Sequence, residues 1–493
     1  MKILMVSSEA TPFAKAGGLA DAVSALARSL ERAGHDLRIL LPRYYFIDRA
    51  SLKPVPGGLS VPFPAGKVHC GLFQGQLPDS KVPVYFIDHE GFYGRDGIYG
   101  TKTEPDFADN TERFALLSRG AFELCRAIDW FPDILHAHDW PSALVPVYLK
   151  YSEDSPDFAA TASVLTIHNL GYQGLYPSGR FPGTGLPWDL FAAAGFEQGD
   201  SLNLLAAGLR AADRLTTVSP TYAREIQTPE YGAGLDSILR HRSANLVGIL
   251  NGVDGGEWDP ATDSYLPATY SRADMAGKAA CKAELQRAMG LPVDDSLPLI
   301  GMVTRLAEQK GIGELFGPMH GSAWRICTGM ALQFAIVGSG EAWCEKELRS
   351  LSARLPNFRA KIGYDDRLAH LVTAGSDFIL VPSHYEPCGL TQLYALKYGS
   401  LPIVRRTGGL ADTVESYDET SGSGTGFMFD ELTPGSVFDT TGWAVWAWYN
   451  KSDHIEAMRD RAMSRVFSWD RSATEYSRLY DMALAAALTR RGA

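Results

Sequence analysis

The chain has 493 residues, of which 46 are basic and 57 acidic, so its formal net charge is −11. This acidic balance argues against broad binding to nucleic acids or anionic membranes, because both reward clustered Lys and Arg. The length exceeds one ordinary hydrophobic core and predicts two domains. The six cysteines lack the spacing of a zinc site or a redox pair, and no apolar run reaches the roughly 18 residues of a membrane span. We therefore expect a cytoplasmic protein with reduced thiols.

Apolar periodicity predicts alternating strands and helices along the whole chain. A strand at 3–7 precedes a glycine-containing loop, an amphipathic helix over 19–33 and a strand over 37–41. Further strands are expected at 134–137, 164–168 and 215–218, and then, after a break at 251–252, at 299–304, 332–338, 378–382 and 401–405. Such alternation is typical of parallel sheets that are covered by helices on both faces.

This pattern predicts an α/β protein with two Rossmann-like, doubly wound domains. The first domain covers residues 1–244 and is joined by the C-terminal helix within 467–493, and the second covers 245–466. Pro, Asp and Thr are frequent over 258–270, which is typical of a connector. The last helix, from about 469 to 488, has apolar spacing suited to packing on the first domain.

Ligands of open α/β sheets bind at the carboxyl ends of strands, so the loops that follow strands are the informative ones. The loop from Lys15 to Asp21 contains paired glycines that let a backbone approach a phosphate, and the sequence 338–340 offers a similar Gly-Ser-Gly. Each of these two loops could equally be an ordinary turn with no ligand. Arg305 supplies a planar fork of donors and Lys310 a point charge, a combination that suits a diphosphate. The alternative interpretation is that both are solvated surface cations, and their position just after an apolar strand favours the diphosphate.

One carboxylate stands apart in the stretch SHYEPCGLTQ at 383–392. Glu386 lies between a strand and a helix, beside a Pro at a favoured first-turn position, where the helix dipole stabilises it. That placement would hold the carboxylate rigidly, which favours a functional role. The alternative is a plain helix cap, which the following Gly-Leu-Thr makes the weaker interpretation.

Histidines follow two further strands, in the segments 136–140 and 166–170. A metal site would need more ligands, and no coherent set completes one, so we predict no bound metal. We also expect His136 and His138 to point to opposite faces of their strand. Polar groups for sugar hydroxyls explain both loops most simply, and a satisfied core or surface imidazole is the alternative for each.

These motifs occur together and in order, and as a set they resemble the bacterial glycogen synthases, a family that includes the plant starch synthases. The similarity covers nearly the whole chain. The matching segments are Lys15 to Leu19, Asp133 to Trp140, Thr166 to Gly174, Thr217 to Tyr222, Ile249 to Asp254, Thr304 to Gly311, Ser383 to Gln392, Arg406 to Thr413 and Phe467 to Trp469. The resemblance implies the GT-B architecture, in which two Rossmann-like domains face a central cleft.

The resemblance further implies retaining transfer of glucose from ADP-glucose to the nonreducing end of an α-1,4-glucan, without a metal or pyridoxal phosphate. Four residues are carried over as catalytic: His168 beside the anomeric centre, Arg305 and Lys310 on the departing ADP, and Glu386 on sugar hydroxyls. The substrate-binding residues carried over are Lys15 and Gly18 (diphosphate and distal sugar), Asp21 (nucleotide), Asp139 and Asn169 (glucose), Cys388, Gly389 and Leu390 (amides beside the carboxylate), Thr391 (phosphate), Tyr364 (adenine), and Tyr99 and Asn251 (acceptor).

Retention of configuration requires a covalent nucleophile or attack on the same face, and no second carboxylate is assigned that could act as nucleophile. We favour front-face attack by the acceptor hydroxyl, with an oxygen of ADP taking the proton. Three alternatives stay open: UDP-glucose as the donor, a catalytically silent glucan-binding scaffold, and a pyridoxal-phosphate-dependent phosphorylase of the same architecture. The oligomeric state is not predicted.

The chain departs from the family's pattern in three places. His384 stands where Arg is usual, Ala16 stands where Thr or Val is usual, and the segment 316–327 matches poorly. We expect that segment to be a helix and a connection away from the chemistry.

Overall fold

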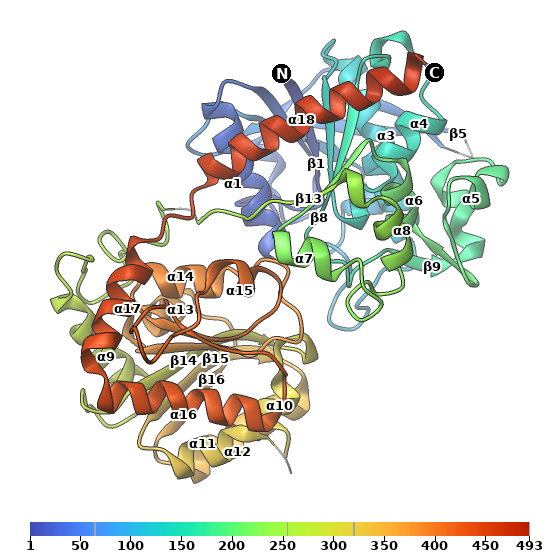
Figure 1. Cartoon of the computed structure of the whole chain (residues 1–493). Helices are drawn as coiled ribbons and strands as arrows, with labels where there is room; N and C mark the ends of the chain where they lie inside the picture. The colour runs from blue at the N-terminus through green and yellow to red at the C-terminus, as the bar shows by residue number, and fades with distance from the viewer. Residues whose placement is uncertain (64–65, 254, 319–320, 493) are drawn as a thin grey trace. The chain divides into compact units, whose positions relative to one another are not determined.

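The structure, a computed structural model, describes residues 1–63, 66–253, 255–318 and 321–492. The chain divides into two compact units: unit 1 is Met1–Gly252 with Trp469–Ala493, and unit 2 is Val253–Ser468 (Figure 1). The sequence predicts these boundaries at 244–245 and 466–467. Among the described helices, none has the length and apolar character needed to cross a lipid bilayer.

Unit 1 is built on a sheet whose central strands run parallel. Within the described residues its order is β13-β12-β8-β7-β1-β2-β6-β5-β3, with β4 paired to β5. The strands from β13 to β6 are parallel, whereas β5 pairs antiparallel with β6, β3 and β4. Strands β9, β10 and β11 form a separate antiparallel sheet. The strands are β1 (Lys2–Val6), β2 (Asp36–Pro42), β3 (Lys53–Pro54), β4 (Leu59–Phe63), β5 (Gly66–Gln76), β6 (Pro83–Asp88), β7 (Ile134–His138), β8 (Ala162–Ile167), β9 (Leu175–Pro177), β10 (Glu197–Gln198), β11 (Ser201–Asn203), β12 (Arg214–Thr217) and β13 (Leu246–Gly248).

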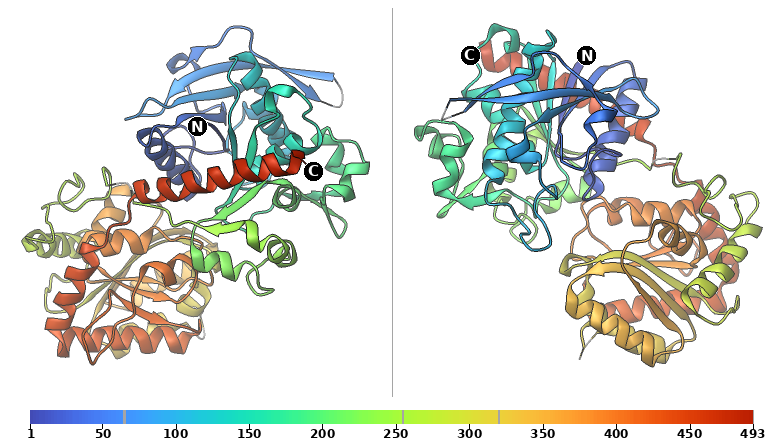
Figure 2. Two further views of the ribbon diagram at one scale, coloured as in Figure 1. Left: turned by 45° about the horizontal axis from the view of Figure 1, so that its top comes forward. Right: turned by 180° about the vertical axis from the view of Figure 1, so that it is seen from behind.

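The C-terminal helix of the chain lies in unit 1 beside α1 (Figure 2). Arg32 of α1 pairs with Asp470 of α18 at 2.8 Å, and His35 Nε2 lies 2.9 Å from Ser477 Oγ. These contacts fix α18 to the helix that follows the first strand. The helices of unit 1 are α1 (Gly18–Arg32), α2 (Glu90–Tyr93), α3 (Asn110–Ala127), α4 (Leu144–Tyr151), α5 (Asp189–Ala193), α6 (Leu204–Ala211), α7 (Pro220–Glu225), α8 (Asp236–His241) and α18 (Trp469–Gly492).

Unit 2 is built on a parallel sheet of order β16-β15-β14-β17-β18-β19 in the described residues. Phe334 and Ile336 of β15 join the core beneath α11, α12 and α16, whereas Ala335 and Val337 join the core beneath α9 and α13. Both faces of the sheet are therefore buried, as its apolar strands require. The strands are β14 (Leu299–Leu306), β15 (Gln333–Gly340), β16 (Phe358–Ile362), β17 (Phe378–Val381), β18 (Leu401–Arg405) and β19 (Phe427–Phe429). The helices are α9 (Ala276–Met289), α10 (Ile312–Phe316), α11 (Ser322–Gly329), α12 (Ala342–Arg354), α13 (Asp366–Gly375), α14 (Thr391–Lys397), α15 (Gly408–Thr413), α16 (Pro434–Asn450) and α17 (Ser452–Ser464).

The strands that the sequence predicts in both series are confirmed, and their ends differ by about two residues at most. The antiparallel strands β3 to β5 were not predicted, because β5 alternates only weakly between buried and exposed residues. The segment 316–327 contains the end of α10 and most of α11. Residues 319–320 of that segment, and Asp254 of the motif at 249–254, lie outside the described residues.

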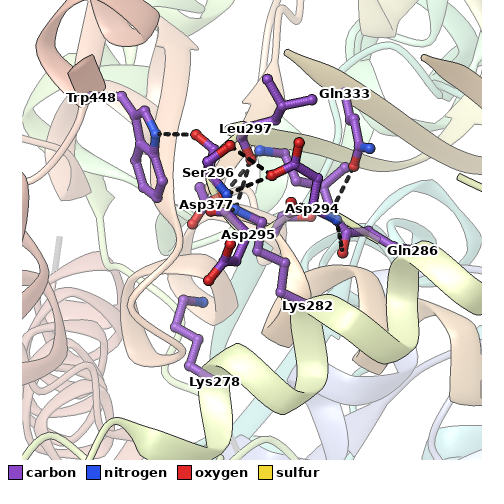
Figure 3. A network of polar contacts seen from close by, with 12 residues as sticks. Lys278, Lys282, Gln286, Asp294, Asp295, Ser296, Leu297, Gln333, Asp377 and Trp448 are labelled. Carbon is purple, nitrogen blue, oxygen red and sulfur yellow. Dashed lines mark hydrogen bonds and ion pairs between the residues drawn. The ribbon is translucent and has the colours of Figure 1, made fainter. Parts of the chain in front are cut away.

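A buried polar network in unit 2 fixes α9 to the amino ends of the two central strands, β14 and β17 (Figure 3). Lys282 of α9 donates to the carbonyl oxygen of Leu297 and pairs with Asp377, each at 2.7 Å. Arg459 of α17 pairs with the other oxygen of Asp377 at 2.7 Å, and the amide of Leu299 donates to the same side chain at 2.9 Å. One buried carboxylate therefore joins two helices to the first residues of β14 and β17.

The substitution Asp377→Asn should lower the free energy of unfolding by about 3–5 kcal/mol, because Lys282 and Arg459 would stay buried beside a neutral amide. Urea denaturation of the purified variant measures this change. The matched control is Asp460→Asn, which breaks an exposed ion pair with Arg272 and should leave stability unchanged. Similar losses in both variants would contradict the role of the buried network.

Candidate active site

The loops after β14 and β17 bring a cation and a carboxylate together at the carboxyl edge of the sheet in unit 2. Lys310 Nζ lies 2.5 Å from Glu386 Oε2, and Ser383 Oγ donates to the same oxygen at 2.9 Å. Glu386 is 6% exposed. The structure thus joins two of the four residues carried over as catalytic, from loops 76 positions apart in the chain.

Close packing of the two loop backbones sets this ion pair. Gly311 follows Lys310 with a φ of +69°, and a Cβ there would lie 2.0 Å from the carbonyl oxygen of Pro382. The amide of His384 donates to the carbonyl oxygen of Gln309 at 2.8 Å. Because only glycine combines this φ with so close an approach, the Lys-Gly sequence is what lets the loops touch.

The turn 388–390 leads into α14, which begins at Thr391. Gly389 has a φ of +70°. The buried side chain of Gln392 donates to the carbonyl oxygens of Cys388 at 3.0 Å and Gly389 at 2.6 Å. Cys388, Gly389 and Leu390 therefore lie in one fixed turn that follows the buried carboxylate, and Thr391 begins the helix after it.

The remaining residues singled out in unit 2 lie nearer the surface. Arg305, the penultimate residue of β14, has an exposed side chain. Tyr364 is 75% exposed, and its hydroxyl donates to Asp366 at 2.6 Å. His384 Nε2 lies 3.2 Å from Glu314 Oε1 of α10. The departure at His384 thus places an imidazole beside a carboxylate, next to the loop that holds Lys310.

In unit 1, the loop between β1 and α1 carries Lys15. Its Nζ pairs with Asp21 at 2.9 Å, and Thr11 Oγ1 donates to the same aspartate at 2.8 Å. Gly18 is the first residue of α1. The structure therefore brings these three predicted residues together, with the Lys15 side chain 48% exposed.

Three histidines cluster at the carboxyl ends of β7 and β8. His138 Nδ1 lies 3.1 Å from His168 Nε2. The expectation that His136 and His138 point to opposite faces is wrong: their ring centroids are 4.1 Å apart, because residues two apart in a strand share a face. Burial lowers the pKa of His136 and of His168 to about 3, so both imidazoles are neutral.

No group of three or more His, Cys, Asp or Glu side chains is arranged to hold a metal ion in the described residues.

Asp139 holds the loop that carries His168. Its carboxylate accepts the amides of His168 at 2.7 Å and Asn169 at 3.4 Å. Its backbone has a φ of +56°, an uncommon value outside glycine that is typical of functional sites. Burial raises the pKa of Asp139 to about 7. The three residues predicted to surround the glucose therefore lie together in unit 1.

Two predicted acceptor residues lie inside unit 1. The Tyr99 hydroxyl donates to Glu9 Oε1 at 2.5 Å, and Asn251 is 7% exposed. Glu9 is not among the predicted site residues, although a carboxylate shortly after a buried strand and before paired glycines is a usable signal. Its partners could not be predicted, because Tyr99 is 90 positions away in the chain.

The chain matches two protein families. The starch synthase catalytic domain matches residues 2–241, and the glycosyl transferases group 1 family matches residues 289–436. The glycogen synthase of Treponema denticola is 56% identical over 97% of this chain and 98% of its own length. Glycogen synthase 1 of Geobacter metallireducens is 47% identical over 98% of this chain and 96% of its own length. The chain belongs to the glycogen synthase family.

One solved structure agrees with this placement, and a more distant one shares the fold. The catalytic domain of starch synthase IV from Arabidopsis thaliana, bound to ADP and acarbose, has a TM-score of 0.88 at 31% identity and covers 98% of this chain and 99% of that one. Sucrose-phosphate synthase from Thermosynechococcus elongatus shares the fold, with a TM-score of 0.60 at 17% identity. The resemblance seen in the sequence is confirmed, and the chain is a glycosyltransferase of the GT-B type.

The raised pKa of Asp139 predicts a pH-dependent stability in this glycogen synthase family member. Folding moves that pKa from its ordinary value near 4 to about 7, so the free energy of unfolding should fall as the pH rises through this window. The fall should be on the order of 2–4 kcal/mol. Asp139→Asn keeps the acceptor for both amides but cannot ionise, so it should lack this step.

Urea denaturation at pH 5 and at pH 8 checks this prediction, with the exposed Asp154→Asn as the control. The wild type and the control should lose stability at the higher pH by the same amount, and Asp139→Asn should lose less. An identical pH dependence in all three proteins would show that Asp139 ionises normally.

Proposed function

We propose that the chain elongates an α-1,4-glucan by transferring glucose from ADP-glucose to its nonreducing end, with retention at the anomeric carbon and release of ADP. The observation that carries this proposal is the buried Glu386 carboxylate paired with Lys310, with Arg305 nearby in sequence, at the carboxyl edge of a parallel sheet. Similarity to glycogen synthases over nearly the whole chain supports it. The ADP and acarbose bound to the Arabidopsis starch synthase support the choice of donor and acceptor.

In unit 2, we propose that Arg305 and Lys310 bind the leaving group of the donor, its diphosphate. Breaking the bond between the anomeric carbon and the diphosphate leaves negative charge on the departing oxygen, which Arg305 and Lys310 would neutralise. Glu386 would accept hydrogen bonds from sugar hydroxyls. The turn 388–390 would present its amides beside that sugar, with Thr391 on a phosphate, and the exposed ring of Tyr364 would stack on the adenine.

In unit 1, we assign the reacting sugar to the loops after β7 and β8. His168 would lie beside the anomeric centre as a neutral imidazole, which can donate or accept a hydrogen bond without adding charge. Asp139 and Asn169 would bind the glucose hydroxyls. Lys15 and Gly18 would contact the diphosphate and the distal sugar, and Asp21 the nucleotide. Asn251 would contact the acceptor.

The chemistry we propose needs no covalent enzyme intermediate. The acceptor hydroxyl forms the new bond to the anomeric carbon on the face that ADP leaves, and its proton passes to the departing phosphate oxygen. The protein supplies charge neutralisation and orientation, which are large contributions to such a reaction. Neither a metal ion nor pyridoxal phosphate is required. A cytosolic site of action fits this proposal, since all six cysteines are free thiols.

Incorporation of labelled glucose into glycogen tests the proposal directly, with ADP-glucose and UDP-glucose compared in parallel and EDTA present. ADP-glucose should be the better donor, and transfer should persist in EDTA. A preference for UDP-glucose would keep the enzyme class and change the donor. Absence of transfer from either donor, in a folded protein that still binds glycogen, would favour the silent scaffold.

The diphosphate role of the cations is tested by Arg305→Ala and Lys310→Ala. Each should lower the rate of transfer roughly 10- to 150-fold, because each removes a charge-assisted hydrogen bond to the leaving group. Arg272→Ala, which removes an exposed arginine from the same unit, should leave the rate unchanged. Near-normal turnover in either site variant would contradict the assignment.

A further inference from the structure

The loop between β1 and α1 contains a buried carboxylate, that of Glu9. Glu9 is 3% exposed, and its Oε2 accepts the amides of Ala16 at 2.5 Å and of Gly17 at 3.0 Å. These two amides directly follow Lys15. Burial raises the pKa of Glu9, and the hydrogen bonds from Tyr99 and from the two amides act in the opposite direction. The Glu9 carboxylate therefore binds two backbone amides of the loop and the side chain of Tyr99, all within unit 1.

Tyr99 completes the surroundings of that carboxylate. Its hydroxyl donates to Glu9 Oε1 at 2.5 Å. Its own backbone is held by α3: Asn110 Nδ2 donates to the carbonyl oxygen of Tyr99, and Arg113 donates to that of Ile98, each at 2.8 Å. Arg113 is fully buried. A continuous set of contacts thus runs from α3 through Tyr99 and Glu9 to the loop.

Backbone hydrogen bonds between Ala10 and Ala14, and one from Thr11 to Ala20, hold the first part of this loop. At Ala16 and Gly17, just after Lys15, the backbone amides are held by Glu9. The loop contains the paired glycines at 17 and 18, and glycine loses more conformational freedom on ordering than any other residue. The side chain of Lys15 reaches outward to Asp21, which is itself part-exposed. The two hydrogen bonds from Ala16 and Gly17 to Glu9 are therefore the contacts that hold the backbone next to Lys15.

We infer that Glu9 and Tyr99 are positioning residues, which fix the Lys15–Gly18 loop in the form that receives the diphosphate of the nucleotide-sugar donor. This inference rests on the proposed function of that loop. It also gives Tyr99 a different role from the acceptor contact expected from the sequence. Neither residue touches the reacting atoms in this role: both act through the backbone of the loop.

The kinetic consequence is a change in donor affinity. If the loop is competent only part of the time, the apparent dissociation constant rises by the inverse of that fraction. Tyr99→Phe and Glu9→Gln should each raise the KM for ADP-glucose roughly 5- to 50-fold, since each removes a hydrogen bond to or from a charged group. The kcat and the KM for glycogen should change less than about twofold, because the bound loop and the acceptor contacts are unaltered.

The conservative variant of Glu9 separates positioning from folding. Gln at this position keeps one carbonyl acceptor for the amides, so Glu9→Ala should raise the donor KM more than Glu9→Gln. The matched control is Tyr93→Phe, which removes another buried tyrosine hydroxyl, bonded to the carbonyl oxygen of Arg113 at 2.6 Å and not to Glu9. This control should keep the wild-type donor KM. A purely structural role would instead lower the active fraction in all four variants and leave the donor KM unchanged.

Hydrogen exchange of the amides of Ala16 and Gly17, measured on the protein without substrates, tests the inference independently of activity. Both amides should exchange faster in Tyr99→Phe and Glu9→Gln than in the wild type and in Tyr93→Phe. Unchanged exchange together with an unchanged donor KM would overturn the inference. A raised KM for glycogen in Tyr99→Phe, with unchanged exchange of the two amides, would show that Tyr99 contacts the acceptor instead. If the wild type transfers no glucose but exchange is faster in the variants, the proposed function fails and the positioning role stands.

Discussion

The ion pair between Lys310 and Glu386 is the interaction on which the proposed donor site depends. A buried carboxylate is costly unless it is paired and hydrogen-bonded, and here a lysine and the hydroxyl of Ser383 meet one of its oxygens. The pair exists because Gly311 lets one loop backbone lie against another. The close loop packing and the ion pair thus hold Lys310 in a fixed position after β14. A fixed cation of this kind is what a departing diphosphate requires.

The same arrangement of a carboxylate after a buried strand recurs in unit 1, where it holds backbone amides. Glu9 follows β1 and accepts amides of the Lys15 loop, and Asp139 follows β7 and accepts amides of the His168 loop. Loops at strand ends carry the polar residues, and these buried acids limit how the loops move. Glu9 thus orients a loop without a proposed contact to substrate, whereas Asp139 orients a loop and is also proposed to bind the glucose.

Much of this was predictable from the sequence. Apolar runs with helical stretches between them gave the parallel strands, and post-strand loops gave Lys15, His168, Arg305, Lys310 and Glu386 as candidates. Pairings across the chain were not predictable. Nothing in the sequence joins Tyr99 to Glu9, and the neutral state of His168 follows from burial that only the fold provides. Hydrogen bonds between loops that are distant in the chain depend on tertiary packing, which local sequence patterns do not predict.

The most direct test of the account is a double-mutant cycle on the Lys310–Glu386 pair, read as kcat/KM for ADP-glucose in Lys310→Met, Glu386→Gln and the double variant. A single preorganised donor site predicts strong coupling, on the order of 1–3 kcal/mol, so that the double variant loses little more than the worse single variant. Losses that simply add would show that the two side chains act independently, and would contradict a single preorganised donor site.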